Sequence, residues 1–158
     1  MSLLRFFMLL SLVVWLGSLI FFAFVVAPAV FSVLPTRQLA GSVVTRTLAA
    51  LHWMGIISGV VFLATSMGYS YATHGAAHPW AARHVLVCLM IVLTLVLQFD
   101  ITARMNHLRL AMGDIDLVPV TDARRVEFNR LHVWSTRVES AVFLMGLAVL
   151  YLTARRLT

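Results

Sequence analysis

Four long apolar runs constrain this chain more than any other feature of its sequence. They cover residues 4–31, 48–71, 81–104 and 130–154. Each run is long enough to cross a hydrocarbon core of about 30 Å as an α-helix. Because 61% of the residues are hydrophobic and 11% are charged, the composition is not that of a soluble domain. The sequence therefore predicts an all-α, four-helix transmembrane bundle, with residues 1–158 as a single integral membrane domain.

The first run has some features of a signal peptide, because Arg5 precedes it and Ala27-Pro-Ala29 lies near its end. The stretch from Phe6 to Val26 is, however, too long for the apolar part of a signal peptide and long enough to span a bilayer. We expect a first transmembrane helix here, with Pro28 kinking its end.

Two polar stretches, residues 36–47 and 121–131, each lead directly into a span. The first begins at Thr36 and the second at Thr121 or Asp122, which are residue types that cap helix N-termini. Polar side chains on one side and Leu or Val on the other favour helices that lie in the membrane interface. We expect two short interfacial helices.

The chain also consists of two similar helical hairpins. The second run opens with Arg46 and reaches His52, whereas the fourth opens with Arg125 and reaches His132. Since both runs point the same way, the similarity predicts a parallel pseudo-repeat about an axis along the membrane normal. Such a repeat would place His52 and His132 at equal depth.

The net charge of +6 comes from arginines that flank the apolar runs, where snorkelling and the orientation bias of membrane proteins place them. No basic patch with interleaved aromatic residues stands apart from the spans, so nucleic acid is excluded as a partner. The lipid bilayer is the expected partner, and the small residues of the second span leave room for a homo-oligomer. The arginine distribution favours both termini outside. We expect a multi-pass protein of the bacterial inner membrane.

The fourth run contains ionisable residues inside an apolar stretch. A charge near the middle of a membrane helix costs about 2.5–3.5 kcal/mol, so such residues usually pair or serve a function. His132, Thr136 and Glu139 follow i, i+4, i+7 spacing and share one helix face, while Arg137 points elsewhere.

The same spacing recurs at the end of the third run, where Asp100 precedes Arg104 in the order that favours a helical ion pair. We therefore expect Glu139 to contact an arginine or histidine across the bundle. The predicted polar core consists of Asp100, Arg104, His107, Arg137 and Glu139.

Paired histidines suggest one specific function. His52 and His132 could supply both axial ligands of haem b, or part of a transition-metal site, with Glu139 behind a ligating imidazole. In the competing interpretation both histidines bind backbone or lipid headgroups, because Trp53 and Trp134 mark the membrane interface.

Two further classes stay open. One is a small-molecule or ion carrier that uses the polar stripe of Glu139 and His132, and the other is a structural or accessory membrane protein. The sequence contains no glycine-rich phosphate loop, CxxC, HExxH or nucleophile elbow, so it assigns no enzyme class.

Several short motifs resemble those of a known family. They are Phe128-x-Arg130-x-His132 followed by Ser135 and Glu139, the turn at Phe31…Leu34-Pro35, and the Asp100…Arg104 helix end. Together they resemble the transmembrane-protein-205-like family, domain of unknown function 4149, over nearly the whole chain. The resemblance implies four membrane helices and no established reaction. A more remote similarity is to copper-resistance-D-like membrane proteins, some of which resemble haem-binding oxidases of porphyrin synthesis. Those proteins carry a ligand on the first helix, whereas residues 4–31 contain no histidine.

Overall fold

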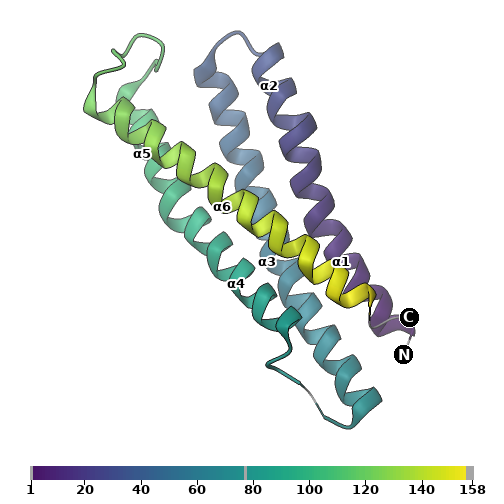
Figure 1. Cartoon of the computed structure of the whole chain (residues 1–158). Helices are drawn as coiled ribbons and strands as arrows, with labels where there is room; N and C mark the ends of the chain where they lie inside the picture. Colours follow the sequence, from purple (N-terminus) through teal and green to yellow (C-terminus); the bar gives the residue numbers. More distant parts are fainter. Residues whose placement is uncertain (1, 77, 156–158) are drawn as a thin grey trace.

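In a computed structural model that describes residues 2–76 and 78–155, the chain folds into four long helical segments (Figure 1). We call each of these segments, including any π-helical turn within it, a rod. The first rod comprises α1 (Ser2–Phe21), the π-helix η1 (Phe22–Val26) and α2 (Ala27–Val33), and the second is α3 (Arg37–His74). The third comprises α4 (Ala82–Val96), the π-helix η2 (Leu97–Ile101) and α5 (Thr102–Met112), and the fourth is α6 (Ala123–Ala154). All four are long and apolar enough to cross a membrane. The predicted all-α architecture with four spans is confirmed.

The two stretches predicted as short interfacial helices are helical from residues 37 and 123 onwards, but each is continuous with the span that follows it. Residues 37–47 are the first turns of α3, and residues 123–131 are the first turns of α6. Neither helix contains a proline, so nothing breaks the backbone between the polar start and the apolar span.

The predicted helix caps are confirmed. Thr36 Oγ1 accepts a hydrogen bond from the Leu39 N–H at 3.2 Å, and Asp122 Oδ1 accepts one from the Arg124 N–H at 2.8 Å. Hydrogen bonds from the Arg124 side chain and backbone lower the pKa of Asp122 to about 2. The cap of α6 therefore stays ionised well below neutral pH.

Two π-helical turns interrupt the first and third rods. In η1 the Ala27 N–H donates to the Phe22 carbonyl, five residues back, directly before Pro28, which has no N–H to donate. In η2 the Thr102 N–H donates to the Leu97 carbonyl in the same way, without a proline nearby. Turns of this kind often occur at functional sites.

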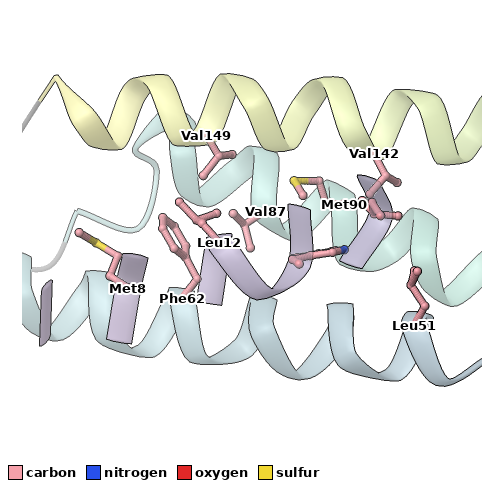
Figure 2. Close-up of a cluster of buried hydrophobic side chains, with 10 residues drawn as sticks. Met8, Leu12, Leu51, Phe62, Val87, Met90, Val142 and Val149 are labelled. Atoms are coloured by element: carbon pink, nitrogen blue, oxygen red, sulfur yellow. The ribbon is translucent and has the colours of Figure 1, made fainter. Parts of the chain in front are cut away.

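The core is apolar and draws on all four rods. Figure 2 shows side chains from α1, α3, α4 and α6 meeting in one cluster. Seven of them are at most 1% exposed: Met8, Leu12, Phe62, Val87, Met90, Val142 and Val149. Lipid is as apolar as these side chains, so close packing rather than escape from water holds such a cluster together.

The two ends of the bundle differ. Both termini and the turn between α3 and α4 lie at one end (Figure 1). The other end carries the turn at residues 34–36 and the loop at residues 113–122, and we call it the loop end. In Figure 1, α2 and the start of α6 lie well apart at the loop end, whereas α1 and the C-terminal part of α6 converge near the termini.

Two glycines of α3 provide a matched test of the packing between α1 and α3. A Cβ at Gly55 would lie 2.5 Å from Trp15 Nε1, whereas at Gly68 the nearest atom, Leu4 Cδ2, would be 3.9 Å away. Because the Trp15 ring is rigid and buried, Gly55→Ala should lower the free energy of unfolding by about 1–3 kcal/mol. Gly68→Ala should be neutral, or stabilising by up to about 1 kcal/mol. Reversible unfolding in mixed micelles measures both, and equal effects would contradict the packing.

Candidate functional site

A buried histidine connects three of the rods. His52 of α3 is 1% exposed. Its Nε2 lies 2.6 Å from Glu139 Oε1 on α6, and its Nδ1 lies 2.8 Å from Gln98 Oε1 in η2. We call Gln98, His52 and Glu139 the polar triad.

The triad uses both ring nitrogens of His52. An ionised carboxylate can only accept, so Nε2–H donates to Glu139. With the Gln98 amide oxygen facing the ring, Nδ1–H donates as well. Turning the amide by 180° would instead let its NH₂ group donate to a neutral ring. In both arrangements neither ring nitrogen is left without a partner.

Gln98 lies in the π-helical turn η2. An inserted residue rotates the following residues by about 100° relative to an uninterrupted α-helix. Leu97 and Ile101 of the same turn are buried and pack with Leu131 of α6 in a second apolar cluster. The turn therefore combines an apolar anchor with the amide that contacts His52.

A pocket of about 400 Å³ opens beside the triad, and Glu139 lines it. The first rod supplies an apolar wall made of Leu19, Ile20, Phe22, Ala23, Phe24, Ala27 and Phe31. Helix α6 lines the pocket with Phe143 and with five polar residues, His132, Ser135, Thr136, Glu139 and Ser140, and α3 and α5 complete it. The predicted common face of His132, Thr136 and Glu139 is confirmed, because all three line this pocket. The Glu139 carboxylate lies between the buried histidine and the open space.

The prediction that Glu139 contacts an arginine or histidine across the bundle is confirmed, but the residue is not one of the polar-core candidates. Its observed partner is His52, not Arg104, His107 or Arg137. Arg104 instead lies 3.7 Å from Asp100 and 3.2 Å from Glu127. Helical spacing places residues on a common face but does not say which way that face points.

Four of the five residues predicted for the polar core lie on the surface of the chain. The Asp100 and Arg104 side chains are 58% and 53% exposed, and His107 is exposed. Arg137 is exposed too, with its guanidinium carbon 5.5 Å from the centre of the Trp134 ring. Glu139 alone of the five takes part in the interior contact.

The two histidines are not equivalent in their surroundings, contrary to the symmetry expected from the pseudo-repeat. His52 is buried, whereas His132 is exposed along the pocket wall. His52 contacts Glu139, which lies seven residues, or about 10 Å along the helix axis, beyond His132. In the described part of the chain, no group of three or more His, Cys, Asp or Glu side chains could hold a metal ion.

Sequence reasoning missed Gln98. Its signal was present, because it is a polar side chain near the end of the apolar run 81–104, where such residues are costly unless paired. A second buried histidine was missed as well. His84 Nε2 lies 2.9 Å from Ser66 Oγ, and its Nδ1–H donates to the His78 carbonyl.

Fold and site define the class as a four-helix membrane protein with a side pocket and a buried histidine paired with a glutamate of the pocket wall. Residues 10–114 match a family model described as Domain of unknown function (DUF4149), and the chain belongs to this family. The match includes His52 and Gln98, whereas Glu139 lies outside it. No curated protein and no solved structure matches the chain.

Removing the Glu139 carboxylate tests the triad. Glu139→Ala leaves His52 Nε2 buried without an acceptor, which should lower the free energy of unfolding by about 1–3 kcal/mol. The control Asp100→Ala removes an exposed ion pair and should cost less than about 1 kcal/mol. Unfolding of both variants is followed by circular dichroism in mixed micelles. If Glu139→Ala unfolds like the parent protein, the contact with His52 does not hold the bundle together.

Proposed function

We propose that the pocket binds a small, mainly apolar molecule from the membrane that carries a hydrogen-bond donor, preferably a protonated amine. One observation carries this proposal. Glu139 Oε1 accepts from His52, while Glu139 Oε2 has no hydrogen-bond partner among the described residues. The carboxylate that lines the pocket therefore has an acceptor to offer.

The walls support a ligand with an apolar body. A volume of about 400 Å³ lies within the range of small-molecule sites, which are mostly apolar with a few polar groups that fix orientation. Here the first rod offers the apolar surface, and Glu139 is the charged anchor.

The rim of the pocket supports entry from the lipid. Ile20, Phe24 and Phe31 line the pocket and are also 44%, 75% and 53% exposed. All three belong to the first apolar run, so the rim lies along a membrane-spanning segment. A molecule dissolved in the bilayer could reach Glu139 without crossing a polar surface.

This proposal develops the carrier hypothesis. His132, Thr136 and Glu139 form a polar line along one wall of the pocket, with His132 nearer the start of α6 and hence the loop end. A molecule with a hydrogen-bond donor could move from Glu139 toward the loop end by passing its hydrogen bond to the Thr136 hydroxyl and then to the His132 imidazole. The bacterial inner membrane remains the proposed location.

Binding of haem b or a transition metal at His52 and His132 stays a prediction, as does the remote similarity to copper-resistance-D-like proteins. Ligation by His52 would require a metal to displace Glu139 from Nε2 or Gln98 from Nδ1. A visible absorption spectrum and metal analysis of the purified protein test this second candidate.

Three amphiphiles of equal chain length test the proposed ligand class: dodecylammonium, dodecanol and dodecanoate. Binding is measured by displacement of a fluorescent alkylammonium from the protein in nanodiscs. The parent protein should bind the ammonium at least about tenfold more tightly than the alcohol, which corresponds to about 1.4 kcal/mol. Glu139→Gln should remove this preference, because the amide is neutral.

A matched pair of variants locates the site. Ala23→Phe fills the pocket wall and should weaken binding of all three amphiphiles, whereas Ala64→Phe, at an exposed position of α3 outside the pocket, should not. Tightest binding of the carboxylate, or equal binding by the Ala23→Phe variant and the parent, would contradict the proposal.

A further inference from the structure

Arg109 is a buried cation at the loop end of the bundle, and it is not part of the polar triad. It lies on α5, is 8% exposed, and packs against α3. Its Nη1 donates to Thr45 Oγ1 at 3.1 Å and its Nη2 donates to Asn106 Oδ1 at 2.7 Å. Both partners are neutral. The Arg109 Nε is buried and has no hydrogen-bond partner among the described residues.

No acidic side chain of the chain balances this charge. The sequence has six acidic residues, and all six lie in the described part. Each is engaged elsewhere: Asp100 with Arg104, Asp114 with the Asp116 N–H, Asp116 with Arg37, Asp122 with Arg124, Glu127 with Arg104 and Arg130, and Glu139 with His52. Because an unpaired buried charge is strongly unfavourable, the counter-ion of Arg109 must come from outside these side chains.

The facing surface of α3 accommodates the guanidinium. A Cβ at Gly41 would lie 3.1 Å from Arg109 Nη1, so the glycine leaves the space that the cation occupies. Gln38, Gly41 and Thr45 follow i, i+3, i+7 spacing and share this face. The buried Gln38 Oε1 also has no hydrogen-bond partner in residues 2–76 and 78–155. The unpaired Arg109 Nε–H on α5 and the unpaired Gln38 Oε1 are both buried, and Gln38 shares its helix face with the two residues of α3 that contact Arg109.

We propose that Arg109 and Gln38 form a binding site for a phosphate group. The planar guanidinium presents several N–H donors in a geometry that matches phosphate oxygens, and a rotated Gln38 amide adds another donor. Phosphate can come from the headgroup of an anionic lipid or from solution. Neither Arg109 nor Gln38 lines the pocket, although Thr45, which accepts from Arg109, does. The phosphate proposal does not rest on the ligand proposed for the pocket.

Melting temperatures in phosphate-free maltoside micelles test the proposal. One arm adds phosphatidylglycerol, and the other adds inorganic phosphate, with chloride at equal ionic strength as the blank. At least one arm should raise the melting temperature of the parent protein by about 4 °C or more. A rise with the lipid alone identifies a headgroup, whereas an equal rise with inorganic phosphate identifies soluble phosphate.

Matched variants separate the site from general charge effects. Arg109→Gln should abolish the rise, and Arg104→Gln, which removes an exposed arginine at the same end, should retain it. Gly41→Ala keeps every charge but crowds the guanidinium, so it should reduce the rise in melting temperature. It replaces Arg109→Gln as the test if that variant does not fold. An unchanged rise in either site variant, or no rise in the parent in both arms, would overturn the proposal.

Discussion

A histidine buried inside an apolar bundle needs polar partners, and its contact with a partly buried carboxylate constrains how the rods meet. The 2.6 Å contact between His52 and Glu139 joins α3 to α6, and Gln98 adds the third rod at 2.8 Å. In a membrane the helices gain little from hiding apolar surface, so close packing and polar contacts decide which faces meet. The triad therefore sets the rotation of three rods about their own axes.

The first rod is held differently, and the pocket follows from that difference. Its α1 part packs tightly, because Gly55 and Gly59 of α3 admit the Trp15 ring and Gly146 of α6 admits Leu16. Beyond these contacts come η1 and α2, in which no residue is buried. The rod thus closes the bundle near the termini and leaves a pocket at Glu139, which is bordered by the apolar side chains of η1 and α2.

The sequence predicted the architecture because apolar runs of membrane length indicate membrane-spanning helices. Thr36 and Asp122 are residue types that cap helix N-termini, so they indicated where two of the helices begin. The sequence also indicated that Glu139 and His132 share one helix face, which lines the pocket. It indicated an arginine or histidine as the partner of Glu139 but not which one, since spacing along one helix does not give the rotation of that helix relative to its neighbours. The π-helical turn η2 shifts the helical register, and no proline in the sequence marks its position. Helical periodicity therefore could not predict that Gln98 points toward His52 or that Asp100 and Arg104 point outward. The similarity of the two hairpins predicted a symmetry that the buried His52 and the exposed His132 do not share.

The most direct test of this account is a double-mutant cycle between His52 and Glu139, with unfolding followed in mixed micelles. His52→Ala, Glu139→Ala and the double variant should give a coupling free energy of about 1–3 kcal/mol, because either change alone removes the whole contact. The same cycle between His52 and Asp100, which do not touch, should give additive effects. Additivity within about 0.5 kcal/mol for His52 and Glu139 would contradict the claim that this pair joins α3 to α6.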